Sequence, residues 1–256
     1  MSELFSIKGK VALVTGGSRG IGLMIARGFV EAGAKVYISS RKQEVCDQVA
    51  RALSKEGTCH SLPADLSDEA EIERLIGEMQ ARESELHLLV NNAGANWGAP
   101  FEEYPASAFD KLFTLNVKAA FLLTRGLVPL LAQAASPKDP ARVINVGSAD
   151  GIRPPALETY AYGASKAGLH HLTRHMARRL STQQITVNAI APGPFESKMM
   201  ESTLEKLREQ VIAAVPLKRI GEPDDMAGIA IYLASRAGSY VTGAIISVDG
   251  GMATCG

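Results

Sequence analysis

The stretch VALVTGGSRGIGLMIARGF (residues 11–29) decides how this chain folds, because it joins three local signals in one short segment. An apolar run ends at Thr15, glycines follow at Gly16, Gly20 and Gly22, and an apolar helical pattern begins among them. Small residues at this G-x-x-x-G-x-G spacing permit a tight turn and let a pyrophosphate approach backbone N–H groups at the positive end of a helix. The segment therefore predicts a strand–turn–helix unit that binds a dinucleotide, the alternative being a glycine-rich turn without a ligand.

The rest of the chain repeats this alternation of strand and helix. Short β-branched runs that are apolar along their whole length are typical of strands covered on both faces. They are KVALVT (10–15), KVYIS (35–39), LHLLVN (86–91), RVINVG (142–147), ITVNAIA (185–191) and AIISV (244–248), with TCHSLP (58–63) as a weaker seventh. Helical patterns lie between them, for example over residues 69–81 and 110–131. Repeated strand–helix–strand units predict an α/β fold, a Rossmann-type doubly wound parallel sheet of about seven strands with helices on both faces.

Length and composition set further limits. The chain has 256 residues, of which 46% are hydrophobic, enough to bury a large core. No internal repeat, low-complexity segment or linker divides it, so a single domain over residues 1–256 is expected. Lys+Arg and Asp+Glu both total 27, and this zero formal charge argues against a nucleic acid or membrane partner.

The cysteines and the amino terminus indicate where the protein works. Cys46, Cys59 and Cys255 are odd in number and fit no metal-binding spacing, so they predict reduced thiols and no metal site. The amino terminus lacks a basic segment followed by a long apolar run, and no run reaches the roughly 18 apolar residues of a membrane span. A cytoplasmic location is therefore expected.

The residues after the second strand indicate which dinucleotide binds. NAD-binding versions of this unit carry an acidic residue there, about 20 residues beyond the glycines, for the ribose 2′-hydroxyl. Here the segment reads YISSRKQ (37–43), without an acid at Ser39 or Ser40 and with Arg41 next. A guanidinium pairs with a 2′-phosphate that an acid would repel, and Arg19 in the glycine turn adds a second candidate contact. NADPH/NADP+ is the predicted cofactor, the alternative being an Arg41 that only faces solvent.

Six motifs, taken together and in order, resemble those of the short-chain dehydrogenase/reductase family. They are TGGSRGIG (15–22), NNAG (91–94), Asn116 within LNV, Ser148 within NVGSADG, YGASK (162–166) and PGPFES (192–197). A lone glycine turn would be weak evidence, but this resemblance covers nearly the whole chain. It implies an oxidoreductase that moves a hydride between a nicotinamide and a substrate carbon, with Asn116, Ser148, Tyr162 and Lys166 as catalytic residues.

Two tyrosines stand near the lysine, and spacing selects one of them. Residues four apart share a helix face, so Lys166 lies beside Tyr162, whereas Ala164 follows Tyr160 at that spacing. Tyr160 is expected to be a packing or pocket-wall residue. An ammonium favours a nearby phenolate, so we expect Lys166 to lower the pKa of Tyr162, the acid that protonates the substrate oxygen.

The resemblance assigns the supporting roles. Ser148 would hydrogen-bond the substrate oxygen, and Asn116 would hold a water that links Lys166 to solvent. Residues after the third strand would meet the adenine, NNAG would flank its ribose, and PGPFES would lie against the carboxamide. The predicted cofactor contacts are Gly16, Ser18, Arg19, Gly20, Ile21, Gly22, Arg41, Asp65, Leu66, Asn92, Ala93, Gly94, Tyr162, Lys166, Pro192, Gly193, Phe195 and Ser197.

Three segments would form the substrate walls: residues 95–105, 149–160 and 194–217. Residues 194–216 of the last segment look like an amphipathic lid. Met199 and Met200 in that lid suit a flexible apolar chain or are ordinary core contacts. The whole chain most resembles the NADPH-dependent 3-oxoacyl reductases of the family, including the rhamnolipid type. The substrate is thus expected to be a small ketone or an acyl thioester, with carrier protein, coenzyme A and free ketone all left open.

Two other functions and an assembly are also weighed. A dehydrogenase of a sugar, polyol or sterol alcohol is the alternative enzyme, and a non-catalytic NADP-sensing protein is the alternative class. The segment SYVTGAIISVDGG (239–251) resembles the family segment that packs between subunits, which implies a homotetramer, or a dimer with the same contacts. His170, His171 and His175 form no metal triad with an acid and are expected at the surface or an interface.

Overall fold

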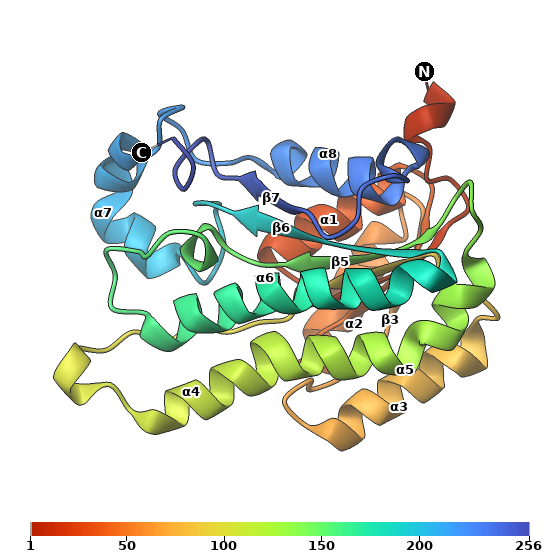
Figure 1. The fold of residues 1–256 in the computed structure, drawn as a ribbon, viewed down its shortest axis with the longest axis horizontal. Coiled ribbons are helices and arrows are strands. Elements are labelled where there is room, and N and C mark those ends of the chain that lie inside the picture. The colour runs from red at the N-terminus through yellow and green to blue at the C-terminus, as the bar shows by residue number, and fades with distance from the viewer. Residues whose placement is uncertain (1, 256) are drawn as a thin grey trace.

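The computed structural model describes residues 2–255 and folds them around one parallel sheet (Figure 1). Its strands are β1 (Val11–Thr15), β2 (Lys35–Ser39), β3 (Thr58–Ser61), β4 (Leu88–Asn91), β5 (Ala141–Val146), β6 (Ile185–Pro192) and β7 (Ile245–Val248). They pair in the order β3-β2-β1-β4-β5-β6-β7, every pair parallel. The strand order reverses between β1 and β4, as in doubly wound sheets, so the predicted fold class is confirmed, with the weaker run at 58–63 as β3.

Helices cover both faces of this sheet (Figure 1). They are α1 (Gly20–Glu31), α2 (Gln43–Leu53), α3 (Glu69–Arg82), α4 (Ala106–Phe113), α5 (Ala119–Ala134), α6 (Tyr160–Leu180), α7 (Glu201–Ala214) and α8 (Pro223–Ala234). Buried side chains of α1, α2 and α8 form one core, and those of α3, α5 and α6 form the other. In Figure 1, β6 points toward the side where α7 lies, which is the carboxyl edge of the sheet.

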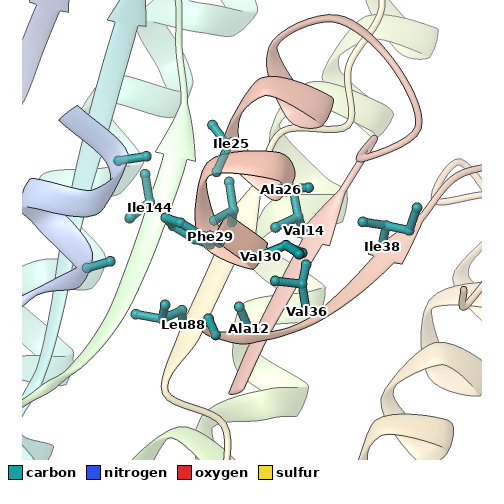
Figure 2. Close-up of a cluster of buried hydrophobic side chains, with 14 of the residues drawn as sticks. Ala12, Val14, Ile25, Ala26, Phe29, Val30, Val36, Ile38, Leu88 and Ile144 are labelled. Carbon is teal, nitrogen blue, oxygen red and sulfur yellow. The ribbon is translucent and has the colours of Figure 1, made fainter. Parts of the chain in front are cut away.

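Each inner strand supplies both cores at once. In β1, Ala12 and Val14 belong to the core under α1, and Val11 and Leu13 belong to the opposite core. Figure 2 shows the first set packed around Phe29 of α1, which is fully buried. Because side chains alternate across a strand, covering both faces requires an apolar residue at every position.

One predicted helix is divided in the structure. The pattern at 110–131 spans α4 and α5, and a π-helical turn, Thr114–Lys118, separates them. By length and composition alone, the combined stretch Ala106–Ala134 is apolar enough to cross a membrane, which the sequence analysis did not anticipate. Its buried leucines, such as Leu123 and Leu127, pack in the core below the sheet, as expected of a core helix in a folded domain.

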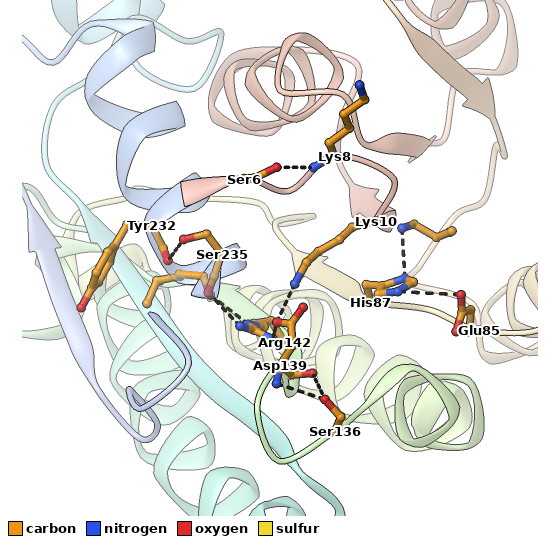
Figure 3. Close-up of polar contacts among 12 residues, drawn as sticks. Ser6, Lys8, Lys10, Glu85, His87, Ser136, Asp139, Arg142, Tyr232 and Ser235 are labelled. Atoms are coloured by element: carbon orange, nitrogen blue, oxygen red, sulfur yellow. Dashed lines mark hydrogen bonds and ion pairs between the residues drawn. The ribbon is translucent and has the colours of Figure 1, made fainter. Parts of the chain in front are cut away.

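An ion cluster ties the amino ends of β1 and β5 together (Figure 3). Asp139 accepts from Lys10 Nζ at 2.8 Å and pairs with Arg142 Nη1 at 2.7 Å. Arg142 is fully buried, and its Nε and Nη2 donate to the carbonyls of Leu233 and Ser235 at the end of α8. These ion pairs and hydrogen bonds hold the amino edge of the sheet together. The predicted functional residues lie at the opposite, carboxyl edge.

Candidate active site

The glycine turn forms one wall of the carboxyl edge. Gly16 and Gly20 have φ values of +63° and +52°, which glycine adopts without strain. α1 begins at Gly20, the side chain of Arg19 makes no capping bond, and the first helical turn contains no acid. The first N–H groups of α1 and its positive end are therefore suited to an anion such as a pyrophosphate. Beside them Ser18 is buried and Ile21 is half-buried.

The turn is held by the segment after β4. Asn92 Nδ2 donates to the carbonyls of Thr15 and Gly16 at 2.9 and 3.2 Å. Thr15 Oγ1 accepts from the backbone N–H groups of Asn92 and Ala93 at 2.9 and 3.0 Å. A methyl group at Gly22 would overlap the Asn92 amide, so only glycine fits there. Two predicted cofactor motifs, distant in sequence, thus form one rigid unit.

The ends of β2 and β3 form the far end of this edge. Arg41 is exposed, and the nearby hydroxyls of Ser39 and Ser40 have no hydrogen-bond partner within residues 2–255. Arg41 and Asp65 both line a pocket of about 560 Å³. Leu66, next to Asp65, is buried. The Arg41 guanidinium suits a phosphate monoester, although the carboxylates of Asp47, Asp65, Glu71 and Glu78 also line this pocket.

The segment after β6 closes the opposite side of the glycine turn. Pro192 ends β6, and Gly193 N donates to the carbonyl of Val248 at 3.0 Å. The buried Phe195 forms a parallel bridge with Gly221. A methyl group at Gly20 would lie 3.1 Å from Cβ of Ser197, so the predicted pyrophosphate and carboxamide segments approach each other closely.

Tyr162, Lys166 and Ser148 lie together at the middle of the edge. Tyr162 and Lys166 are buried on α6, and Lys166 Nζ lies 5.6 Å from the centre of the Tyr162 ring. The same ammonium donates to the carbonyl of Val146, the last residue of β5, at 2.8 Å. Ser148 follows two residues later, and its Oγ accepts from Asp150 N at 3.1 Å, which leaves its own O–H free to donate.

Burial dominates the acid–base properties of this pair. It raises the pKa of Tyr162 to about 12, an effect that Asp150 strengthens and the Ser148 hydroxyl opposes. Burial also lowers the pKa of Lys166 to about 8. The expected net lowering of the Tyr162 pKa is therefore wrong for this structure, because desolvation of the phenolate outweighs the Ser148 hydrogen bond that favours it.

Asn116 lies in the π-helical turn between α4 and α5, and such turns are frequent at functional sites. Its Oδ1 accepts from Ala95 N at 2.9 Å, and its Nδ2 donates to the carbonyl of Ala95 and to Ser165 Oγ. A methyl group at Gly94 would come within 3.1 Å of that Oδ1 and 3.6 Å of Lys166 Nζ. The Asn116 side chain thus ties the segment after β4 to α6, a role that the sequence analysis did not foresee.

The structure separates the two tyrosines as the spacing predicts. Tyr160 is exposed, and its ring lies 5.3 Å from that of Phe101 and 5.2 Å from that of Tyr104, both edge-on. Its hydroxyl donates to Glu158 rather than toward Tyr162. Tyr160 therefore belongs to an aromatic wall that joins two of the predicted substrate segments.

The structure corrects the prediction for one buried residue of this edge. His170 was expected at the surface or an interface, yet it is 4% exposed, whereas His171 and His175 are exposed. The available signal was its spacing, four residues beyond Lys166 and so on the same helix face. Residues 2–255 contain no group of three or more His, Cys, Asp or Glu side chains arranged for a metal ion.

The carboxyl edge of this doubly wound parallel sheet holds a glycine turn, a helix without a side-chain N-cap, and a buried tyrosine–lysine pair. Together these features define a dinucleotide-dependent oxidoreductase. A family model described as enoyl-(acyl carrier protein) reductase matches residues 16–253. Together with the relatives below, this match shows that the chain belongs to the short-chain dehydrogenase/reductase family.

The relatives include several activities within that family. The rhamnolipids biosynthesis 3-oxoacyl-[acyl-carrier-protein] reductase of Pseudomonas aeruginosa is 49% identical over 98% of this chain and 99% of that protein. A solved structure described as the P. aeruginosa RhlG/NADP active-site complex matches with a TM-score of 0.96 and 47% identity, over 99% of this chain and 100% of that one. A 3α-hydroxysteroid dehydrogenase of Mediterraneibacter gnavus is 34% identical over 95% of this chain and 97% of that protein.

Proposed function

We propose that this chain is an NADPH-dependent carbonyl reductase that reduces the ketone of a 3-oxoacyl-type substrate. The observation that carries the proposal is the burial of Ser148, Tyr162 and Lys166 together at the carboxyl edge, beside the glycine turn. The 49% identical relative from P. aeruginosa, a 3-oxoacyl-[acyl-carrier-protein] reductase, supports the substrate class.

The residues present fit NADPH along the whole edge. The N–H groups at the start of α1 would hold the pyrophosphate, and Arg41 would hold the 2′-phosphate. Asp65 and Leu66 would meet the adenine, and residues 192–197 would meet the carboxamide. When bound, NADPH supplies the hydride.

Three side chains act on the carbonyl oxygen of the substrate. Ser148 donates a hydrogen bond to it and stabilises the charge that develops there. Tyr162, protonated because burial raises its pKa to about 12, gives its proton to that oxygen. Lys166, whose pKa of about 8 keeps it largely cationic at neutral pH, favours the phenolate that the transfer leaves. Asn116 would hold the water through which the proton is replaced.

The proposed substrate carries an apolar chain. The segments 95–105, 149–160 and 194–217 expose Trp97, Phe101, Ile152, Leu157, Tyr160, Met199, Leu207 and Leu217. Exposed apolar groups gathered in the segments around a site gain free energy when a hydrocarbon chain covers them. We assign residues 194–216, which include α7, as the lid that closes over such a chain within a single domain.

One observation favours a second candidate, the oxidation of a sterol alcohol. The 34% identical relative is a 3α-hydroxysteroid dehydrogenase, and a rigid apolar ring system would also suit exposed apolar walls. A panel assay with the purified protein decides between them. We expect absorbance loss of NADPH, more than of NADH, with 3-oxoacyl thioesters or β-keto esters. Turnover confined to sterol alcohols with oxidised cofactor would replace the proposal by the second candidate.

We also propose that the protein is a cytoplasmic homotetramer. Phe109, Phe113 and Phe121 are exposed at four- and eight-residue spacings along α4 and α5, and Tyr240 is fully exposed in the segment 239–251. Two separate apolar surfaces suit two kinds of subunit contact. Light scattering coupled to size-exclusion chromatography measures the mass; a dimer would require only one of the two surfaces, and a monomer would exclude both.

A further inference from the structure

α6 carries a third buried polar side chain in line with its catalytic pair, and the proposed mechanism does not use it. His170 lies four residues beyond Lys166 and eight beyond Tyr162, a spacing that keeps all three on one helix face. It is 4% exposed, whereas His171 and His175 on the same helix are exposed. The imidazole therefore faces the interior of the site.

The ring of His170 packs directly on the turn that carries Ser148. A methyl group at Gly147 would overlap Nε2 of the ring, and one at Gly151 would come within 2.9 Å of Cε1. The methyl group at Gly151 would also lie 2.7 Å from the backbone carbonyl carbon of Lys166. Ser148 stands between the two glycines, so the ring and the helix hold both ends of its turn.

The ring does this as a neutral group. Burial, followed by the charge of Lys166, lowers the pKa of His170 to about 4, and the charge of Arg174 lowers it further. Hydrogen bonding to the Gly151 backbone has the opposite effect. Nε2 has no hydrogen-bond partner within the described chain. The contribution of His170 is thus packing under Gly147 together with a backbone contact at Gly151, rather than proton transfer.

We propose that His170 is a positioning residue for Ser148: its imidazole seats the turn from Gly147 to Gly151 and so holds the Ser148 hydroxyl toward Tyr162. This inference rests on the proposed function for the role of Ser148. The packing of the His170 ring requires Gly147 and Gly151, because any larger residue at Gly147 would displace the ring. In this arrangement His170 does not touch the substrate and acts only through the turn that carries Ser148.

The test compares His170→Asn with His171→Asn, a matched change at an exposed position on the same helix. Loss of the ring frees the turn, and removing a hydrogen-bond donor from a developing oxyanion costs about 100-fold in kcat, so we expect H170N to lose about 10- to 100-fold in kcat. KM for NADPH should stay the same, because the glycine turn of α1 is untouched. H171N should match the wild-type enzyme in both constants.

Combining His170→Asn with Ser148→Ala distinguishes a positioning role of His170 from a general loss of structure. In the S148A background, H170N should cost less than about threefold in kcat, since the group that it positions is already gone. An equal loss in both backgrounds, a loss confined to KM, or no loss at all would overturn the inference. Should H170N fold poorly, His170→Gln, which keeps an amide near Nε2, is judged by the same comparison.

A measurement without substrate keeps this inference apart from the proposed function. Hydrogen exchange of the amides from Gly147 to Ile152 should be about tenfold faster or more in H170N and unchanged in H171N. Unchanged exchange in H170N would contradict the packing role whatever the enzyme reduces. Conversely, a wild-type enzyme that reduces no 3-oxoacyl compound would sink the proposed function and leave the exchange result standing.

Discussion

At the scale of single residues, Tyr162 and Lys166 are both protonated near neutral pH. Burial raises the pKa of Tyr162 to about 12 and lowers that of Lys166 to about 8, so the phenol keeps its proton and the ammonium is the first of the two to release one as pH rises. The phenol is therefore prepared to act as an acid. This favours reduction of a carbonyl as the direction in which the pair works without prior deprotonation.

Replacing the acid tests this directly. Tyr162→Phe keeps the ring and removes the proton, so turnover should fall by about 100-fold or more, the range for loss of a general acid. NADPH should still bind, as measured by quenching of its fluorescence. Tyr160→Phe is the control, because that hydroxyl is exposed and bonds Glu158, and its activity should remain near wild type. Full activity in Y162F would overturn the assignment.

Arg41 is the residue that we propose to discriminate between the two nucleotides. Arg41→Asp replaces a guanidinium by a carboxylate beside the predicted 2′-phosphate site, so NADPH binding should weaken by about 10- to 100-fold while NADH binding changes little. Titration of each nucleotide measures the two dissociation constants. Arg51→Asp, an equal charge change at an exposed position of α2, should affect neither. Equal losses for both nucleotides would show that Arg41 does not contact the 2′-phosphate.

His170 also makes the stability depend on pH. Its pKa is about 4 in the folded chain and near 6.5 when unfolded, so between these values only the unfolded chain takes up the proton. The free energy of unfolding should therefore fall as pH drops from about 6.5 to about 4, by about 3 kcal/mol for this group. Urea unfolding across this range should show the loss in wild type and a smaller one in H170N. His60 and His87, whose burial also lowers their pKa, add to this slope, and Asp150, whose burial raises its pKa, opposes it.

At the scale of elements, the strands could be predicted from the sequence and the irregular turns could not. Runs such as KVYIS coincide with β2 because both faces are covered, whereas β3 lies at the sheet edge, exposes Thr58 and His60, and gives a weaker signal. The π-helical turn around Asn116 could not be predicted from the sequence, because one extra residue does not interrupt the apolar pattern at 110–131. His87 shows the same limit, because no pattern in the sequence reveals that its Nδ1 accepts from Val11 N at 3.2 Å.

The site residues divide in the same way. Motif spacing brought Tyr162 and Lys166 to one helix face, and the structure places them there. Burial, which decides their pKa values and the position of His170, depends on the segments packed over α6, and no local pattern in α6 reveals that packing. Sequence could therefore predict which side chains meet, but not how strongly their surroundings change them.

The helix that opens the nucleotide site depends on the core beneath it. Phe29 of α1 is fully buried among Val14, Val36 and Ile144, so Phe29→Ala should lower the free energy of unfolding by about 3 to 5 kcal/mol. Urea denaturation measures the change. Phe5→Ala, at an exposed position, should stay within about 0.5 kcal/mol of wild type. A small effect at Phe29 would mean that α1 does not depend on this packing.

At the scale of the whole molecule, the two edges of the sheet have separate tasks. The carboxyl edge carries the glycine turn, the tyrosine–lysine pair and the apolar segments around them. The amino edge carries Lys10, Asp139 and Arg142, which join β1, β5 and the end of α8 (Figure 3). Because the strands separate the two groups, a change at the amino edge should alter stability without altering the chemistry.

Asp139→Asn tests this division. The change leaves Arg142, fully buried, and Lys10 without their shared counter-charge, so it should cost about 3 kcal/mol of unfolding free energy. Burial raises the pKa of Asp139, but hydrogen bonds from Lys10 and Arg142 outweigh it and hold the pKa below its usual value. The contribution is therefore complete above about pH 4 and is lost as pH falls through the lowered value.

An exposed ion pair provides the control for Asp139→Asn. Glu56→Gln breaks an exposed pair with Arg27, and should cost less than about 1 kcal/mol. At a temperature where D139N remains folded, its kcat and its KM for NADPH should equal those of wild type, because no atom of the cluster reaches the carboxyl edge. A D139N enzyme that is as stable as wild type, or one that is folded but slow, would show that the charged edge and the reactive edge are coupled through the sheet.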